Sequence, residues 1–481
     1  MEKKYLYNLL IVGLCLVLGA CNGYLDEIPQ NKQKLSTTDD YDQLLNNAYL
    51  TKVVLPYIDV LTDDMDYIAA DRDPGYANSS DTYLGAHLWD NSIETTMPNG
   101  DEAFENFYNS IFNTNVVIEN IDHAVGDVLD ETVVRQTRNH IKGEAYALRA
   151  FRYFYLVNMY GAPYENADQA KNAMGVPINK EISILDKIYV RERLQTVYDL
   201  IEEDLKSALD NFNKGEVKNT IFRPNKDVAR LFLSRAYLFQ KKYDKVITVC
   251  DDMIKETVKM IVPLEEMKTY TEYSSGVPLY NKNSHSLLYT CWARDAMSGF
   301  NSGYWYGKYA ISDDLKKQYG VNDVRPKVFF DYYGVKPIKY TDYGGCYGMC
   351  YRIEEIYFNR AEAYIESGDY ELGMKDVNRI YSQRIDDVNV SLSASDVENA
   401  RKLFRQEKRR ELCFETIRWF DIRRWGLAVE HDYKDINDPS MYQTYVLEAN
   451  SPNYILPLPL DIQRRNDKIE KPERVEAKLK N

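Results

Sequence analysis

The sequence has no excess of basic residues. Its 481 residues include 60 Lys and Arg against 74 Asp and Glu, which gives a net charge of −14. A nucleic-acid-binding surface must neutralise phosphates with basic side chains, so we expect no nucleic-acid partner. The same balance disfavours a polyanionic ligand, although a local basic pocket could override it.

Cysteine and histidine are scarce, with seven and five residues. Cys15 and Cys21 belong to the N-terminal segment, and the odd number of cysteines that remains is not a disulfide framework. Cys346 and Cys350 are closely spaced, and both a local disulfide and free thiols stay open for them. A zinc site needs further ligands at comparable spacing, and the histidines are scattered, so we expect no metal ion and no cofactor.

Motifs of common catalytic sites are missing as well. The sequence contains no HExxH, no GxSxG and no phosphate-binding loop. Adjacent carboxylates occur at Asp63-Asp64 and Glu354-Glu355. Neighbouring residues on a helix do not face each other, whereas a glycosidase needs two carboxylates across a cleft. We therefore expect a protein that is not an enzyme.

Long apolar runs are also rare. The run from Leu9 to Leu18 follows Lys3 and Lys4, and it is shorter than the roughly 20 residues of a membrane span. A basic start, a short apolar core and small residues after it are the layout of a secretory signal peptide. We therefore expect residues 1–20 to be removed.

The end of this run, Leu18-Gly19-Ala20-Cys21, resembles a bacterial lipobox. In that class of signal the cut precedes the cysteine, which is then acylated, and several acyl chains hold the N-terminus on a membrane. We expect Cys21 to be the lipidated first residue and residues 21–36 to be a tether. An ordinary signal peptide, with Cys21 as a bystander, is the alternative.

Helical spacing of apolar residues dominates after residue 37. Thr37 to Asp40 reads as a capping box, and helices are expected within 143–161 and 191–212. Residues 228–254 and 354–380 read as two helical hairpins that superpose without a gap, so that Ala236 matches Ala363 and Tyr243 matches Tyr370. This is the tetratricopeptide pattern, although unrelated helical hairpins would look similar.

Two stretches lack this periodicity. Residues 60–100 and 262–350 are rich in Asn, Gly and Tyr, which is typical of long loops and short helices. Tyrosine is abundant, with 41 residues, and its flat face and polar tip suit binding surfaces as well as helix cores. We therefore predict a mainly all-α fold: a tetratricopeptide scaffold with long irregular insertions that form the ligand-binding side.

Residues 405–428 combine charges at helical spacing with large apolar residues. The spacing predicts the pairs Glu407–Arg410, Glu415–Arg418, Arg418–Asp421 and Asp421–Arg424 within a helix. Because Trp419 and Trp425 lie between these charges, we expect both tryptophans in the core and the charges in a partly buried network. Such a network fixes geometry more than it adds stability.

Taken in order, these segments resemble the SusD/RagB family of surface glycan-binding lipoproteins over nearly the whole chain. The resemblance depends on the lipobox with the residues up to Pro29 and on six further segments, namely 143–161, 223–246, 311–325, 351–380, 407–426 and 454–462. The chain departs from the family pattern at Lys408, where Arg is usual, at Thr416, where Gly is usual, and in its closing residues.

The resemblance implies a protein without catalytic activity on the outer face of the outer membrane. It implies an N-terminal region at 37–225 and a C-terminal region at 226–481, which we expect to form one compact unit. Family members close over a TonB-dependent, SusC-like transporter barrel and deliver an oligosaccharide to it. Some branches deliver a peptide instead, and an adaptor that binds only protein is a third hypothesis.

Sugars present flat CH faces and a rim of hydroxyl groups, so a sugar site needs aromatic platforms beside polar side chains. Two stretches, 71–91 and 292–306, contain both, and ligand contacts come from corresponding regions in the family. For Trp89, Tyr304 and Trp305 a place in the core is the alternative, and Arg72 could simply pair with Asp73. The expected ligand-binding residues are Arg72, Asp73, Tyr83, Trp89, Asn91, Trp292, Tyr304, Trp305 and Tyr306.

Overall fold

The computed structural model describes most of the chain after the N-terminal segment. The described residues are 35–50, 56–69, 83–90, 102–183, 187–216, 218, 220–270, 279–281, 283–291, 308–339, 349–435, 438 and 440–480. Within these ranges no helix combines the length and the apolar character that a membrane crossing requires.

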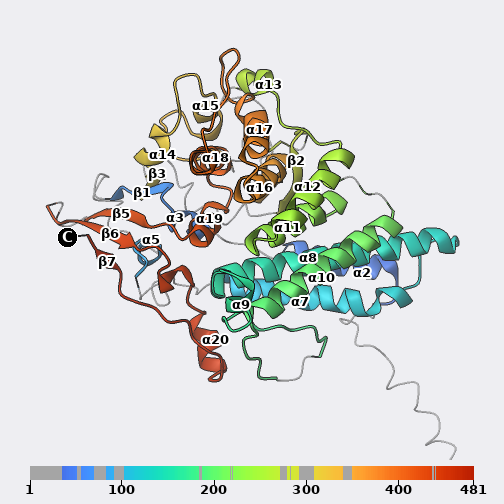
Figure 1. Cartoon of the computed structure of the whole chain (residues 1–481). Helices are drawn as coiled ribbons and strands as arrows, with labels where there is room; N and C mark the ends of the chain where they lie inside the picture. The colour runs from blue at the N-terminus through green and yellow to red at the C-terminus, as the bar shows by residue number, and fades with distance from the viewer. Residues whose placement is uncertain are drawn as a thin grey trace, which may run out of the picture.

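Nine longer helices of the described residues form one continuous scaffold, in which each helix packs against the one that follows it in this series (Figure 1). The run starts at the lower right of Figure 1 and ends at the top centre, and this architecture confirms the predicted helical fold class. The helices are α2 (Thr38–Leu50), α7 (Glu102–Asn120), α8 (Glu131–Tyr160), α10 (Leu194–Lys214), α11 (Lys226–Phe239), α12 (Tyr243–Glu256), α16 (Ile353–Glu366), α17 (Tyr370–Tyr381) and α18 (Val397–Leu412).

Shorter elements gather mainly beside this scaffold. The short helices are α3 (Pro56–Val60), α5 (Leu84–His87), η2 (Ile121–His123), α9 (Ala167–Ala170), α13 (Leu264–Thr269), α14 (Asp313–Lys317), α15 (Arg325–Phe329), α19 (Arg418–Trp425), η3 (Pro452–Tyr454) and α20 (Leu460–Arg465). The strands pair antiparallel in three small sheets, namely β1 (Met65–Tyr67) with β3 (Tyr309–Ile311), β2 (Leu287–Cys291) with β4 (Met349–Arg352), and β5 (Val429–Lys434), β6 (Tyr442–Leu447) and β7 (Lys478–Leu479) in that order.

The expected helix boundaries have identifiable chemical causes. Thr37 and Asp40 form a reciprocal capping box: the Asp40 N–H donates to the Thr37 hydroxyl at 3.1 Å, and the Thr37 N–H donates to the Asp40 carboxylate at 2.8 Å. Helix α8 ends at Tyr160, and Gly161 follows it as the expected stop. The Asn225 side chain caps α11 by accepting from two backbone N–H groups.

The two predicted hairpins are α11–α12 and α16–α17. Ala236 and Ala363 occupy matching positions in the first helix of each hairpin and are fully buried. In the second hairpin a Cβ added at Gly373 would lie 2.7 Å from the Ala361 carbonyl oxygen. Small residues therefore let the paired helices approach closely, as the repeat pattern requires.

The largest hydrophobic cluster of the described residues draws its members from both ends of the sequence and from the segments between them. It contains Ile58 near the N-terminus and Ile469 near the C-terminus, together with residues of α8, α10, α11 and α12. The regions before and after residue 225 therefore share one core.

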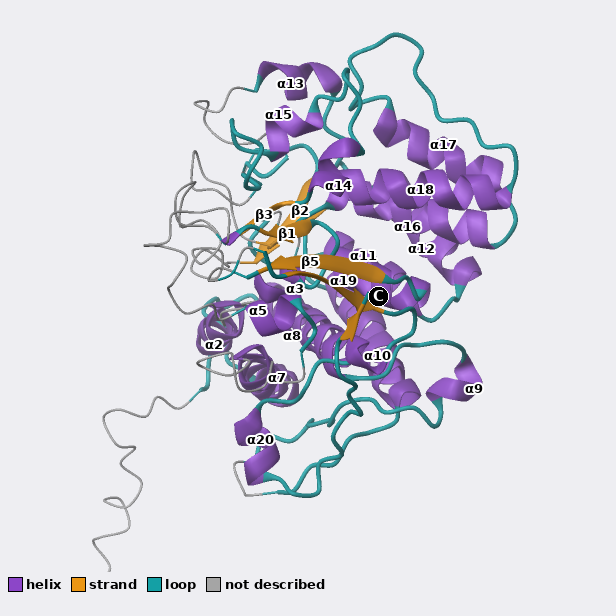
Figure 2. Ribbon diagram, turned by 90° about the vertical axis from the view of Figure 1, so that its left-hand side faces the viewer, coloured by secondary structure: helices purple, strands orange, loops and turns teal. Residues whose placement is uncertain are grey.

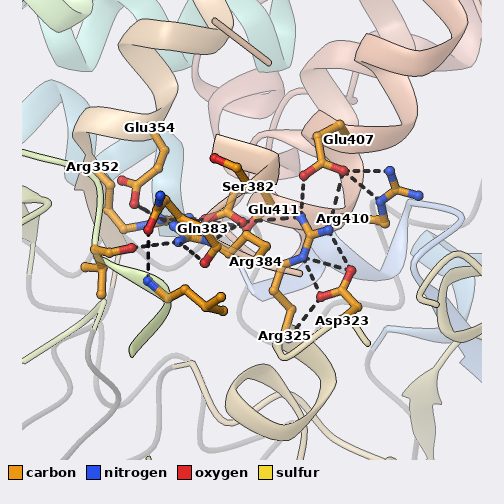
Figure 3. A network of polar contacts seen from close by, with 12 residues as sticks. Asp323, Arg325, Arg352, Glu354, Ser382, Gln383, Arg384, Glu407, Arg410 and Glu411 are labelled. Carbon is orange, nitrogen blue, oxygen red and sulfur yellow. Dashed lines mark hydrogen bonds and ion pairs between the residues drawn. The ribbon is translucent and has the colours of Figure 1, made fainter. Parts of the chain in front are cut away.

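A network of buried ion pairs joins α18 to α15, to β4 and to the residues after α17 (Figure 3). Glu411 of α18 accepts from Arg384 at 2.9 and 3.0 Å, from Arg352 at 3.0 Å and from Arg325 at 3.4 Å. All four side chains are fully buried. Burial alone would raise the pKa of Glu411, but the three guanidinium groups hold it well below its ordinary value.

The predicted charge pairing within 405–428 is only half correct. Glu407 pairs with Arg410 and Asp421 with Arg424, as expected. Glu415 instead pairs with Lys339 and Arg352, and Arg418 with Asp63, each in a distant part of the chain. The predicted helix is in fact two helices, and the break separates Glu415 from Arg418. Arg418 and Asp421 share α19, but Asp421 pairs with Lys408 and Arg424 instead.

The break between α18 and α19 has a conformational cause. Phe414 and Thr416 adopt left-handed backbone angles, with φ of 59° and 56°, and neither type of residue favours this region. The resemblance leads us to expect Gly at the position of Thr416, and glycine tolerates this conformation at no steric cost. The other departure, Lys408, is buried and keeps a cation beside Asp421 at 2.9 Å.

Both tryptophans of this segment pack as expected, although to different degrees. Trp419 is fully buried in the main core. Trp425 is half-buried, packs against a satellite cluster of α16–α18, and donates its indole N–H to Glu362 at 2.8 Å.

The ion network predicts a large effect of a single amide substitution. Glu411→Gln should lower the free energy of unfolding by about 3–5 kcal/mol, because three buried guanidinium groups lose the anion that they share. Urea denaturation of the folded chain measures this change. Glu448→Gln is the matched control, since Glu448 and Lys478 form a solvent-exposed pair, and it should cost less than about 1 kcal/mol. Equal losses in the two variants would contradict the role given to the network.

Candidate functional site

The two stretches predicted to bind ligand are attached to paired strands. Tyr67 of β1 faces Tyr309 of β3 across the pair, and the Ile68 N–H donates to the Lys308 carbonyl at 2.8 Å. Stretch 71–91 follows β1 in the chain, and stretch 292–306 precedes β3. The pairing of β1 with β3 therefore brings together the ends of two segments that are about 200 residues apart in the chain.

Two arginines from the C-terminal part hold the turn that precedes β1. The Asp63 carboxylate accepts two hydrogen bonds from Arg418, at 2.8 and 2.7 Å, and Asp64 accepts one from Arg409 at 2.7 Å. Burial alone would raise the pKa of Asp63, but Arg418 and Arg409 hold it well below its ordinary value. These charge-assisted bonds fix the start of the strand pair.

Strand β5 lies against β1 and completes the base, beside α3 and α19 (Figure 2). The Tyr433 ring stacks on Tyr67, with ring centroids 5.7 Å apart, and Tyr309 meets Tyr67 edge-on at 5.5 Å. Below them the imidazoles of His87 and His431 stack in parallel at 3.8 Å. Aromatic rings from four separated segments thus pack into one cluster, which we call the aromatic base: Tyr67, His87, Trp89, Tyr309, His431 and Tyr433.

His431 connects two segments of the base through their backbones. Its Nδ1 lies 2.6 Å from the His87 carbonyl oxygen, and its Nε2 lies 2.8 Å from the Thr62 carbonyl oxygen. Both carbonyl contacts raise the pKa of His431 because they favour the protonated imidazole. Burial lowers it by more, so the pKa is below its ordinary value. The ring therefore links the residues before β1 to α5.

His87 is buried with one donor in use. Its Nδ1 donates to the Val60 carbonyl at 2.9 Å, and its Nε2 has no hydrogen-bond partner within the described part of the chain. Burial lowers the pKa of His87 well below 6.5, and the nearby His431 lowers it further. The neutral imidazole is the form that the folded protein holds.

Trp89 is a correction to the predicted ligand-binding residues. Its side chain is 1% exposed, stacks on His431 at 4.3 Å, and donates its indole N–H to the Leu61 carbonyl at 3.2 Å. Its backbone has a φ of 52° and its carbonyl accepts from Asn453 at 3.2 Å. The core alternative therefore describes Trp89, and no face of its ring is open to a sugar.

The other expected contacts divide into one described residue and seven that are not described. Tyr83 is half-buried at the start of α5 and packs against the main core. The remaining residues lie outside the described ranges and stay predictions: Arg72, Asp73, Asn91, Trp292, Tyr304, Trp305 and Tyr306. The lipidation of Cys21 stays a prediction, and both a disulfide and free thiols stay open for Cys346 and Cys350, because Cys21 and Cys346 are not described.

Sequence reasoning did not identify the residues of β5 as part of this site. A signal was present, since Val429 and His431 alternate with exposed residues as in a half-buried strand. Nothing local indicates that His431 contacts His87, which lies 344 residues earlier in the chain.

The adjacent carboxylates at positions 63–64 and 354–355 are each paired with arginine. Asp63 pairs with Arg418, and Asp64 pairs with Arg409. Glu354 pairs with Arg352 and Arg384, and Glu355 pairs with Arg235. No group of His, Cys, Asp and Glu that could hold a metal ion occurs among the described residues.

Three of the four described cysteines lie in the core with thiol pKa values above the ordinary one. Cys250, Cys291 and Cys413 are buried and free, as expected. Burial raises the pKa of the Cys291 and Cys413 thiols to about 11 and also raises that of Cys250. None of the three is therefore a thiolate nucleophile at neutral pH.

Comparison with known proteins identifies the same architecture. Residues 23–238 match a family model described as starch-binding associating with outer membrane, and residues 236–471 match the model of the SusD family. The two matches together extend over nearly the whole chain. No curated protein matches it.

Solved structures show the fold at low sequence identity. A SusD superfamily protein from Bacteroides thetaiotaomicron is 20% identical with a TM-score of 0.71, and the match covers 91% of this chain and 100% of that one. A SusD superfamily protein from Bacteroides vulgatus is 19% identical with a TM-score of 0.72 (91% and 99%). A SusD-like carbohydrate binding protein from Bacteroides vulgatus is 18% identical with a TM-score of 0.66 (90% and 97%).

The buried imidazole of His87 predicts a pH dependence of stability. As the pH falls below 6.5, unfolded chains take up a proton that folded His87 does not, so the folded state loses stability. His87→Asn keeps a donor for the Val60 carbonyl but cannot titrate. Its unfolding free energy should therefore fall less steeply between pH 7 and pH 5, by up to about 1.4 kcal/mol per pH unit.

Urea denaturation at pH 7, 6 and 5 measures this difference. His285→Asn controls for the loss of a histidine as such, because the His285 side chain is 57% exposed. If His87→Asn and the wild type lose stability in parallel on acidification, the folded protein does not keep His87 neutral.

Proposed function

The chain belongs to the SusD/RagB family, and from that membership we propose that it binds an oligosaccharide at the cell surface and delivers it to a SusC-like, TonB-dependent transporter barrel. The pairing of β1 with β3 carries this proposal. It ties two stretches with aromatic and polar side chains to one rigid base, which is the combination that a sugar site needs. A family model described as starch-binding supports carbohydrate as the ligand.

The proposed role is capture without chemical conversion. The adjacent carboxylates that could have suggested a hydrolase are each paired with arginine, and Asp63 and Asp64 support the strand pair. A general acid with a free proton and a nucleophile facing it across a cleft are the features of glycoside hydrolysis. The paired carboxylates fit a structural role instead.

We further propose that residues 1–20 are a signal peptide and that lipidated Cys21 holds the protein on the outer membrane, facing outward. The residues between Cys21 and Leu35 would span at most about 50 Å. This length is enough for the folded part to swing over the mouth of a neighbouring barrel. The N-terminal region 37–225 and the C-terminal region 226–481 would move together, since they share a core.

Binding by the soluble form, residues 22–481, tests the function. Calorimetry and a glycan array should show binding to at least one oligosaccharide. Tight binding to peptides and to no glycan would overturn the proposal and favour the peptide-delivering branch of the family. Binding to neither, with retention of a protein partner, would favour an adaptor.

Two tryptophan variants make the same experiment specific. Trp305→Ala should weaken glycan binding with little change in thermal stability, because Trp305 is proposed as a stacking platform. Trp89→Ala is the matched comparison, since Trp89 is buried in the aromatic base, and it should lower the free energy of unfolding by about 3–5 kcal/mol. A comparable loss of stability in Trp305→Ala would place that residue in the core as well.

The anchor is tested in cells. Cys21→Ala should release the protein from the membrane fraction and abolish growth on its glycan, while the purified protein binds as before. Cys15→Ala is the control, because Cys15 lies within the apolar core of the signal and is removed with it. Membrane retention of the Cys21→Ala protein would show that another segment anchors it.

A further inference from the structure

An exposed pair of tyrosines projects from a turn next to β3. Tyr332 is 83% exposed and Tyr333 is 64% exposed, and their rings meet edge-on with centroids 5.3 Å apart and planes at 87°. Single exposed aromatic residues are common, but two adjacent ones form a patch, and exposed patches of this kind often mark a binding site. Both residues lie in the irregular region 262–350, but neither belongs to the stretches 71–91 and 292–306 that contain the expected ligand-binding residues.

The turn that carries them is firmly held. The Asp331 carboxylate accepts from the Val335 N–H at 2.7 Å and from the Lys336 N–H at 3.1 Å. Across the turn, the Asp331 N–H donates to the Lys336 carbonyl at 2.9 Å, and Gly334 takes the left-handed conformation with a φ of 63°. These bonds close the turn on both sides of the tyrosines, so the rings are presented by an ordered backbone.

The base of the turn is anchored in a hydrophobic cluster. Phe330 is buried and pairs with Pro337 across the turn. Its ring packs edge-on against Tyr319 at 5.5 Å and Phe414 at 6.4 Å. The tyrosines are therefore outward-facing residues on a buried stem, and ring stacking on a ligand would cost little conformational entropy.

The turn is connected to the candidate site through β3. The Ile311 N–H donates to the Val335 carbonyl at 2.9 Å, so residue 335 lies beside the strand that pairs with β1. From strand spacing and rise, the turn lies within roughly 20 Å of the point where stretch 292–306 joins β3.

We propose that Tyr332 and Tyr333 form a second, outer contact for a neutral glycan chain, a proposal that rests on the proposed function. Each ring offers a flat face for the CH face of a pyranose and a hydroxyl group for its rim. The Asp331 carboxylate is engaged by backbone N–H groups of the turn, so the contact with the ligand is made by the two uncharged tyrosine side chains. Because roughly 20 Å separates the turn from the start of β3, a ligand that contacts both must be several sugar residues long.

The test compares short and long oligosaccharides by calorimetry on the 22–481 protein. The probes are maltotriose and maltoheptaose, with the matching short and long members of the xylan, mannan and laminarin series. For the series that the wild type binds, the double variant Tyr332→Ala/Tyr333→Ala should bind the long member about 10-fold more weakly. Its affinity for the short member should stay unchanged.

Two further variants separate stacking from other effects. Tyr332→Phe/Tyr333→Phe keeps both ring faces and should restore most of the affinity for the long member. Leu129→Ala changes an exposed apolar residue in the link between α7 and α8 and should bind like the wild type.

Three results would overturn the contact. If the double alanine variant binds the long oligosaccharide as tightly as the wild type does, the inference fails while the proposed function stands. If that variant binds both lengths normally but no longer co-purifies with the transporter, the turn is a protein contact. If the wild type binds no glycan of any series, the proposed function fails, and the outer contact fails with it.

Discussion

The shared carboxylate of Glu411 is the interaction on which the rest of the structure depends. It receives Arg325 from α15, Arg352 from β4 and Arg384 from the residues after α17. Buried charges of this kind add little stability beyond well-packed apolar residues, but an unpaired one is costly, so the arrangement tolerates only one relative placement of its elements. The network thereby fixes the position of the end of α18, from which the chain continues through the break into α19.

That break places the arginines that hold the candidate site. Arg409 lies near the end of α18 and Arg418 begins α19, and both reach the turn before β1. The ion network therefore connects the helical scaffold to the strand pair from which the two proposed ligand-binding stretches extend. The same arginines pair with the carboxylates of Asp63 and Asp64, so these charges serve the rigidity of the base.

Periodicity and capping chemistry were sufficient to predict the helical scaffold, because the interactions that define it are within a few residues of each other. Trp89 was harder to interpret: its Asp-, Asn- and Gly-rich surroundings resemble a loop, whereas its partner His431 lies on a distant strand. The pair Glu415–Arg418 was mispredicted for a related reason. Residue spacing on a continuous helix says nothing about a backbone that turns left-handed at Phe414 and Thr416.

The contacts that close the base also determine when it can form. Asp63 and Arg418 are 355 residues apart in the chain, and Thr62 and His431 are 369 residues apart. Contacts of such high sequence separation come late, because the intervening chain must be ordered first. Most scaffold helices can assemble in chain order as the protein emerges, but the strand pair is locked only when the last segments arrive. Competence to hold a ligand is then a single late event in the maturation of the protein, so a chain truncated before α19 would have much of the scaffold and no receptor.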